Sequence, residues 1–303
     1  MSDTPTLVLE HVTKKFGDFT AVDDLSVQVR PGRVFGLIGP NGAGKTTTIR
    51  MIVNITIPDS GRIDLFGEPM SAQLQDRIGY LPEERGLYRK MKVGEQLRFF
   101  AELKNVRGSA ADQRIDIWLA KRQLSEWKNK RAKDLSKGMQ QKIQFITAVI
   151  HDPDLLILDE PFSGLDPVNV ELMKKTILEK KAEGKTIILS THQMEIAEKL
   201  CDDVCMINRA QKVLDGQLRE IRRSFARHAV MLQVSGADGA FSDASLVAQV
   251  HRHGDETEVL LAPGADPQKL LKRLVESGAV VSRFELAEPS LHDIFLEKVR
   301  EAS

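Results

Sequence analysis

Apolar and polar side chains alternate in two stretches near the start of the chain, residues 6–12 and 21–30, and this period of two predicts half-buried β-strands. Three later stretches, residues 34–38, 155–158 and 186–190, are rich in apolar residues and hardly alternate. Short apolar runs of this kind are typical of parallel strands that are buried on both faces. The chain is therefore expected to combine partly exposed strands with the central strands of a parallel sheet.

A helical pattern fills the long segment between these strands. From about residue 89 to residue 150, helix-forming residues dominate, and Ile143, Ile146 and Ile150 recur at helical spacing. Beyond residue 223 the pattern changes again, and short strands and helices are predicted at residues 228–234, 256–261, 266–278, 280–286 and 290–300. We therefore expect an α/β domain over residues 1–223 with a helical insert, followed by a small α+β domain over residues 224–303.

The loop after the first buried strand carries the most specific motif. It reads Gly39-Pro40-Asn41-Gly42-Ala43-Gly44-Lys45-Thr46-Thr47 and fits G-x-x-x-x-G-K-[ST] between a predicted strand and a predicted helix. Glycines let the backbone approach a phosphate closely, and the N-terminus of the helix favours an anion. Lys45 is expected to reach the β- and γ-phosphates, and the Thr46 hydroxyl to bind Mg²⁺.

Two carboxylates and a histidine follow the other buried strands. Asp159 and Glu160 come directly after residues 155–158, and His192 follows residues 186–190. Ligands bind α/β sheets at the carboxyl ends of the strands, so these side chains are expected to meet the phosphate loop. We interpret Asp159 as a Mg²⁺ ligand, directly or through water, and Glu160 as the group that activates the attacking water. His192 is interpreted as a γ-phosphate contact; the alternatives are solvated acids and a structural histidine.

A basic segment lies at the end of the helical insert. Residues 121–142 contain eight Lys or Arg against two Asp or Glu, and Ser136 is placed to cap the helix that follows it. The capped N-terminus and the surrounding charge predict a second anion site, with an exposed basic helix face as the alternative.

Composition narrows the class of protein. The 303 residues carry 43 basic and 43 acidic side chains, so no footprint for nucleic acid is indicated. No apolar run approaches the roughly 18 residues that a membrane span requires, the N-terminus lacks a secretory pattern, and two cysteines argue against a disulfide framework. Cys201 and Cys205 have helical spacing and are interpreted as a packed pair of thiols. These features favour the cytoplasm and leave contact with a membrane partner open.

The order of these motifs resembles that of the ATP-binding-cassette ATPases over roughly residues 6–223. The resemblance implies a P-loop cassette with a RecA-like parallel-sheet core, an antiparallel β subdomain and the helical insert. It identifies residues 39–47 as Walker A, residues 155–159 as Walker B, Glu160 as the catalytic glutamate and His192 as the switch histidine. Lys45 belongs to the catalytic group in this scheme.

The same resemblance assigns residues that bind nucleotide from further away. Ser136 and Gly138 fall in the signature loop, which in the family completes the ATP site of the other subunit. Residues 163–166 look like the D-loop and contribute Asp166. Phe16 stands where the family places an aromatic ring that stacks on adenine, with Phe19 as the less favoured alternative.

Two motifs depart from the usual family pattern. The signature loop continues with Lys137-Gly138-Met139 where Gly-Gly-Gln is usual, and Glu83 stands in the loop that normally carries Gln. Glu83 is expected to contact nucleotide and Mg²⁺ in place of that Gln. Both variants, and the small C-terminal domain, resemble bacterial export-type cassettes, including sodium-efflux ATP-binding subunits.

These observations together predict an ATP-hydrolysing subunit that binds ATP and Mg²⁺ and works as a homodimer or heterodimer. It is expected to energise a separate integral membrane permease, for export, from the cytoplasmic face of the cell membrane, without binding nucleic acid. The alternatives are a soluble cassette ATPase of the translation or DNA-repair type and a nucleotide-binding module without turnover. The transported substrate is not identified by the sequence.

Overall fold

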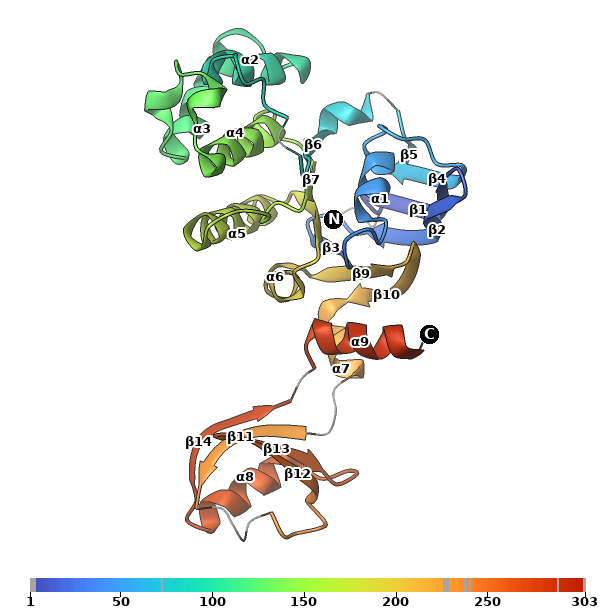
Figure 1. The fold of residues 1–303 in the computed structure, drawn as a ribbon, viewed down its shortest axis with the longest axis vertical. Helices are drawn as coiled ribbons and strands as arrows, with labels where there is room; N and C mark the ends of the chain where they lie inside the picture. The colour runs from blue at the N-terminus through green and yellow to red at the C-terminus, as the bar shows by residue number, and fades with distance from the viewer. Residues whose placement is uncertain are drawn as a thin grey trace. The chain divides into compact units, whose positions relative to one another are not determined.

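The computed structural model describes residues 4–71, 73–84, 86–225, 229–236, 239, 241–287 and 289–301. The chain divides into two compact units, residues 1–218 and 219–303 (Figure 1). The boundary falls where α7 (Leu218–Ser224) begins. The domain boundary between residues 223 and 224 stays a prediction.

A four-stranded antiparallel sheet opens the first unit. Its order is β2 (Phe19–Val29), β1 (Leu7–Phe16), β4 (Ser60–Leu65) and β5 (Glu68–Pro69). Alternate residues of β1 and β2 are buried, as the period of two predicts. The register shifts within both pairings of β1, which bends this sheet locally.

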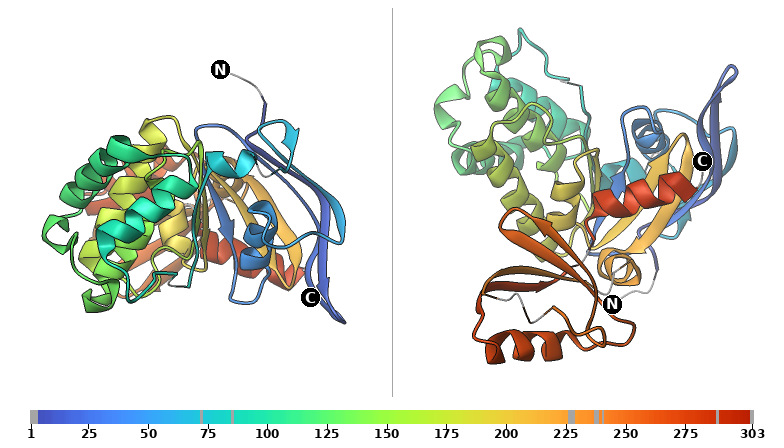
Figure 2. Two further views of the ribbon diagram at one scale, coloured as in Figure 1. Left: turned by 90° about the horizontal axis from the view of Figure 1, so that it is seen from above. Right: turned by 60° about the horizontal axis from the view of Figure 1, so that its bottom comes forward.

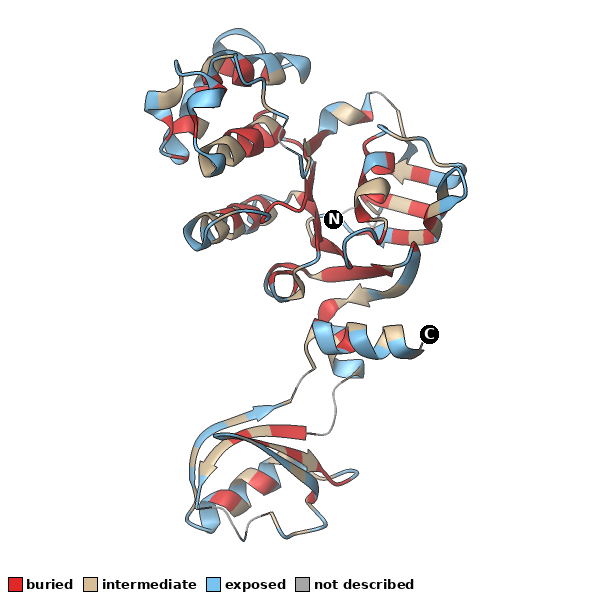
Figure 3. Cartoon of the chain, in the orientation of Figure 1, coloured by how far each residue is buried: buried red, intermediate tan, exposed pale blue. Residues whose placement is uncertain are grey.

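The second sheet of this unit carries the predicted parallel core. Its strands are β10 (Gln211–Gln217), β9 (Asp203–Asn208), β3 (Val34–Ile38), β8 (Thr186–Thr191), β7 (Leu155–Asp159) and β6 (Ile78–Leu81), in that order. All neighbours pair in parallel except β10, which runs antiparallel to β9 at one edge. β3, β7 and β8 are buried along their whole length (Figure 3). The carboxyl ends of β6, β7, β8 and β3 therefore meet at one edge of the sheet.

Helices cover this sheet and form the insert. The connecting helices are α1 (Lys45–Ile52), α5 (Pro167–Ala182) and α6 (Met194–Leu200), and the short 3₁₀ turn η1 (Leu74–Arg77) precedes β6. The insert consists of α2 (Val93–Leu103), α3 (Gly108–Lys121), the 3₁₀ turns η2 (Ser125–Trp127) and η3 (Ala132–Asp134), and α4 (Lys137–Val149). It lies on the opposite side of the parallel sheet from the antiparallel one (Figure 2).

Each lobe of the first unit has its own apolar core. One core joins the antiparallel sheet to α1 and the parallel strands, with Leu25, Ile49 and Ile157 at its centre. The other lies within the insert, where Leu97, Ile115 and Ile143 are fully buried or nearly so. The insert therefore has an apolar core separate from that of the sheets.

The second unit is a small antiparallel sheet with helices. Its strand order is β12 (Val247–His253), β13 (Glu256–Leu261), β11 (Ala229–Ser235) and β14 (Val280–Leu286). α8 (Pro267–Glu276) packs its buried Leu270 and Leu274 in the same core as Val230 and Leu232, and α9 (Leu291–Glu301) ends the described chain. β12 was not predicted, because its sequence, Val-Ala-Gln-Val-His-Arg-His, does not alternate apolar and polar residues regularly.

The described residues also correct one detail of the sequence analysis. Cys201 directly follows α6 as its C-cap residue and Cys205 lies within β9, so the two buried thiols do not share a helix. Among the helices that the structure describes, none combines the length and apolar character needed to cross a bilayer.

Candidate functional site

The phosphate loop is held by close contacts with two neighbouring strands. A Cβ at Gly39 would lie 2.1 Å from the carbonyl oxygen of Ile207, and a Cβ at Gly44 would lie 2.3 Å from that of Ala21. Only glycine allows such an approach. Gly44, with φ of 111°, is also the N-cap residue of α1. The loop therefore presents the N-terminus of α1 at the carboxyl edge of the parallel sheet, where an anion is favoured.

Lys45 lies inside this loop. Its side chain is almost completely buried, and its Nζ donates hydrogen bonds to the carbonyl oxygens of Gly39 at 2.8 Å and Pro40 at 3.1 Å. The same ammonium lies 3.5 Å from Oε1 of Glu160. A buried cation is thus aimed at the space between the loop and the end of β7.

Asp159 ends β7 with one oxygen satisfied and one free. Its Oδ1 accepts hydrogen bonds from the hydroxyls of Ser190 and Thr46, the latter at 3.4 Å. Its Oδ2 is buried and has no hydrogen-bond partner among the described residues. Burial raises the pKa of this carboxyl, while the two hydroxyl bonds oppose the rise. A buried carboxylate oxygen beside a threonine hydroxyl suits a hard divalent cation, so Asp159 and Thr46 fit Mg²⁺.

Glu160 follows in a backbone conformation that is unusual for its residue type. Its φ is 47°, in the left-handed region, and such conformations cost on the order of 1–3 kcal/mol. Its amide donates to both the carbonyl oxygen and the hydroxyl of Ser190, at 3.2 and 3.0 Å. Nδ1 of His192 lies 3.0 Å from each Glu160 carboxylate oxygen. The turn after β7 thus directs Glu160 to Lys45 and His192.

Glu83 lines one pocket together with Asp159 and Glu160. The pocket has a volume of about 350 Å³ and is lined by residues 81–84, Gln141, Gln144, residues 159–161, Ser163 and Gly164. Glu83 is exposed and follows β6, so it reaches the pocket from the strand next to Asp159. Its roles as a nucleotide and metal ligand stay predictions. Arg85, which could neutralise it, lies outside the described residues.

Ser136, Gly138 and Asp166 lie at the starts of α4 and α5. Ser136 caps α4, and its hydroxyl accepts from the amide of Met139 at 3.3 Å, which confirms the predicted cap. Asp166 caps α5 and accepts from the amide of Asn169, a bond that lowers the pKa of Asp166. Gly138 faces Asn169, whose Nδ2 would be 3.2 Å from an added Cβ. Ser136, Gly138 and Asp166 are not among the described residues that line the 350 Å³ pocket.

The two candidate adenine-stacking rings stand opposite each other. Phe16 and Phe19 pair across the turn between β1 and β2, and both are more than half exposed. The Nζ of Lys14 lies 5.5 Å from the centre of the Phe16 ring. Either ring is accessible for stacking, so the choice between them stays a prediction.

The basic segment is partly committed to internal contacts. Arg122 is buried, donates to the Thr176 hydroxyl at 2.6 Å and lies against the rings of Trp118 and Phe145. Arg122 therefore adds no exposed positive charge to this segment. Lys121 and Lys128 pair with Glu179 and Asp116. Three of the eight basic side chains of residues 121–142 are thus engaged in contacts within the chain, and the second anion site stays a prediction.

Sequence reasoning missed three polar side chains that shape the site. Ser190 contacts both Asp159 and Glu160, and Gln141 and Gln144 bond to the loops that carry Glu160 and Glu83. Ser190 is a polar residue at the end of an apolar run, and this is the local signal that could have indicated a role in the site. The glutamines sit in an ordinary helical pattern and carried no signal.

Comparison with protein families matches both parts of the chain. Residues 22–163 match the family model described as ABC transporter. Residues 216–299 match the model described as the C-terminal domain of ATP-binding proteins like DrrA1-3.

Individual relatives and solved structures agree with these matches. An uncharacterized ABC transporter ATP-binding protein of Bacillus subtilis, YhaQ, is 44% identical over 97% of this chain and 98% of its own length. The Nod factor export ATP-binding protein I of Cupriavidus pinatubonensis is 36% identical over 97% of this chain and 90% of its own. A solved ATP-binding subunit of an ABC transporter is 31% identical with a TM-score of 0.68, covering 73% of this chain and 93% of the other.

A second solved structure, cbiO1 from Clostridium perfringens, is described as part of the ABC transporter complex cbiONQ. It is 26% identical with a TM-score of 0.63 over 73% of this chain and 94% of the other. The predicted cassette fold is thereby confirmed. With its phosphate loop, its carboxylates at the ends of the parallel strands and its near full-length relatives, this chain belongs to the ABC transporter ATP-binding proteins.

Proposed function

We propose that this chain binds ATP with Mg²⁺, hydrolyses it, and thereby energises a separate membrane permease for export. One observation carries the proposal most directly. The Glu160 carboxylate lies within 3.0 Å of His192 and 3.5 Å of Lys45, directly after Asp159 with its buried, unpartnered oxygen. A general base, two groups that can contact phosphate and a metal ligand therefore converge at one sheet edge.

In this mechanism the chain's own residues bind, orient and move a proton. The loop amides and Lys45 bind the β- and γ-phosphates. Thr46 and Asp159 would hold Mg²⁺, which would neutralise charge on the phosphates. Glu160 accepts a proton as the water oxygen attacks the γ-phosphorus and the bond to the β-phosphate oxygen breaks. His192 holds the Glu160 carboxylate in place and contacts the γ-phosphate.

The residues outside the pocket suit a site shared between two chains. Ser136 and Asp166 cap α4 and α5 at the surface, and neither lines the described pocket around Glu160. We propose that Ser136, Gly138 and Asp166 contact the nucleotide of a second cassette in a head-to-tail dimer. The exposed capped terminus of α4 provides the anion-binding geometry for this contact.

Two kinds of observation support the proposals of a permease partner and of export: the names of the relatives and one exposed apolar groove. The relatives named as Nod factor export proteins, and the DrrA-like C-terminal match, support export. A groove of about 590 Å³ between the parallel sheet and the insert is bordered by the exposed apolar side chains of Ile55 and Leu103. Exposed apolar patches of this kind mark protein–protein contacts, so we propose this groove for the permease, at the cytoplasmic face of the membrane.

The test of this function is the Glu160→Gln variant. Loss of the general base is expected to slow ATP hydrolysis about 100-fold or more while ATP binding is retained. The measurement is phosphate release together with nucleotide binding. Glu84→Gln is the matched control, because Glu84 lines the same pocket and has no assigned role.

Two outcomes would contradict the proposal. Hydrolysis by Glu160→Gln at the wild-type rate would remove Glu160 from the reaction. Wild-type protein that binds ATP without releasing phosphate would favour the nucleotide-binding module without turnover, and isolation without any membrane partner would favour the soluble, non-transport class.

A further inference from the structure

Two glutamines one helical turn apart on α4 bond to the loops that carry the acidic residues of the site. Nε2 of Gln141 donates to the carbonyl oxygen of Pro161 at 2.7 Å. Nε2 of Gln144 donates to the carbonyl oxygen of Glu84 at 2.8 Å and to that of Pro82 at 3.3 Å. Positions three apart on a helix share one face, so a single face of α4 holds both loops.

The bonded carbonyls lie next to the reactive carboxylates. Pro161 directly follows Glu160, and Pro82 and Glu84 flank Glu83 on both sides. Residues 82–84 and Pro161 lie beyond the ends of β6 and β7, and the last described contact of the second loop with the sheet is the bond from the Glu160 amide to Ser190. A side-chain donor that holds the carbonyls of these loops therefore adds a constraint on the backbone around Glu83 and directly after Glu160.

Gln144 also occupies a boundary between two cavities. It is 5% exposed, and together with Pro82 it lines both the 350 Å³ pocket around Glu160 and the 590 Å³ groove beside the insert. A buried amide with two carbonyl acceptors leaves little freedom for the loop between them. A displacement of α4 or of the groove wall is thus transmitted to the backbone on either side of Glu83.

We infer that Gln141 and Gln144 are positioning residues that make α4 and the two acidic loops move as one body. The inference rests on the proposed hydrolysis at this site. Because α4 begins at the Ser136 cap, whatever engages that end of the helix also sets the positions of Glu83 and Glu160. The pair acts through the loops and touches no substrate.

The experiment uses the purified full-length chain with Gln144→Met, which keeps the shape of the side chain and removes its donor. Turnover is expected to fall at least about tenfold with KM for ATP within about threefold, since small misplacements of reacting groups are costly. Hydrogen exchange at the amides of Glu83 and Glu84 is expected to accelerate. Gln141→Met should lower turnover likewise and accelerate exchange at Phe162.

Gln96→Met is the matched control. Gln96 is a fully buried glutamine of α2, in the same insert, whose Oε1 accepts from the amide of Tyr88 at 2.7 Å. Its loss should lower thermal stability as much as the loss of Gln144, without changing turnover or the exchange of Glu83 and Glu84. A variant combining Gln144→Met with Glu83→Ala should lose no more turnover than the worse single variant, because both act through one loop.

The outcomes separate this inference from the proposed function. Unchanged exchange at Glu83 and Glu84 in Gln144→Met overturns the inference, whatever the rate of hydrolysis. Faster exchange with unchanged turnover, or additive losses in the double variant, overturns the positioning role while hydrolysis by the wild type stands. If the wild type fails to hydrolyse ATP, the proposed function fails, and exchange alone decides whether the glutamines hold the loops.

Discussion

At the scale of single residues, one hydroxyl contacts both acidic residues at the end of β7. The Ser190 side chain is completely buried, donates to Oδ1 of Asp159 and accepts from the amide of Glu160. The first bond engages Oδ1 of Asp159 and leaves Oδ2 without a hydrogen-bond partner among the described residues, and the second holds the left-handed turn at Glu160. The strand pairing of Asp159 with Ser190 brings these groups together.

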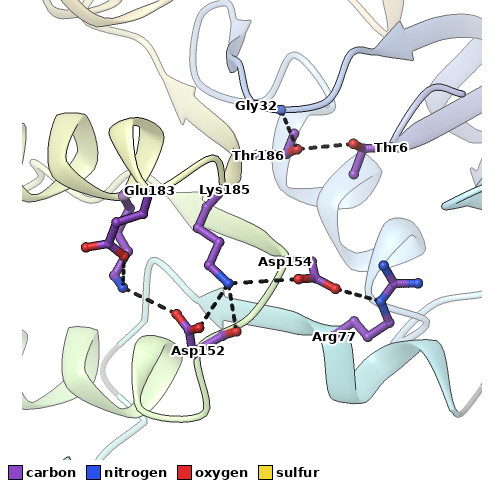
Figure 4. Close-up of polar contacts among 9 residues, drawn as sticks. Thr6, Gly32, Arg77, Asp152, Asp154, Glu183, Lys185 and Thr186 are labelled. Atoms are coloured by element: carbon purple, nitrogen blue, oxygen red, sulfur yellow. Dashed lines mark hydrogen bonds and ion pairs between the residues drawn. The ribbon is translucent and has the colours of Figure 1, made fainter. Parts of the chain in front are cut away.

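Ser190→Ala is expected to raise the Mg²⁺ concentration needed for half-maximal hydrolysis about tenfold, the usual scale for losing the partner of a metal ligand. Thr186→Val is the control at the other end of β8. Its hydroxyl accepts from the amide of Gly32 at 3.0 Å and bonds to the hydroxyl of Thr6 at 3.1 Å (Figure 4). Each change should lower the free energy of unfolding by about 1 kcal/mol. If hydrolysis depended on Mg²⁺ concentration in the same way in both variants, Ser190 would have no role in positioning Asp159.

At the scale of elements, α4 and α5 meet through their capped N-termini. Ser136 caps α4, Asp166 caps α5, and Asn169 lies between Asp166 and Gly138. A cap leaves the remaining first-turn amides available to an anion. The surface formed by these two helix starts is therefore the part of the cassette best suited to a partner's phosphate.

Ser136→Arg is expected to leave ATP binding nearly intact and to abolish hydrolysis, because a bulky cation replaces the small cap. Mixing this variant with Lys45→Ala chains forms dimers in which one site carries both lesions and the other carries neither. Partial recovery of phosphate release is expected, with Ser136→Thr as the control that keeps the hydroxyl. A mixture as inactive as its components would contradict sites shared between chains.

At the scale of the whole molecule, the groove beside the insert is the surface proposed for the permease. The side chains of Ile55 and Leu103 are 63% and 58% exposed at its rim, and those of Tyr88 and Phe99 extend the apolar patch. Lys104 is the cation within the groove, where burial lowers its pKa while its Nζ donates to the Gln75 carbonyl. The groove thus offers an apolar surface, and Lys104 is the one lysine or arginine among its described lining residues.

Leu103→Asp is expected to reduce the amount of membrane protein that co-purifies with this chain at least about tenfold, as for a central interface residue. Val275→Asp is the control, since it changes an equally exposed apolar residue of the second unit. Hydrolysis by the purified chain alone should stay within about threefold of wild type for both, the usual result of a surface change. Full recovery of the membrane protein with Leu103→Asp would move the permease contact elsewhere.

The sequence by itself determined the parts of this protein that depend on neighbours in the chain. The phosphate loop from Gly39 to Thr47, the buried runs that end at Asp159 and before His192, and the Ser136 cap are local patterns, because each needs only a strand, a turn or a helix start. The order of these patterns along the chain was enough to indicate the cassette fold, which the comparisons confirm.

Only the tertiary structure decided which distant side chains meet. Ser190 contacts Asp159 because β7 and β8 pair, and Gln144 bonds to the backbone around Glu83 because α4 returns to the end of β6. Arg122 reads as a surface cation in the sequence, yet it is buried against Trp118. These contacts depend on packing between elements that are remote in sequence, and no periodicity or local propensity encodes such packing.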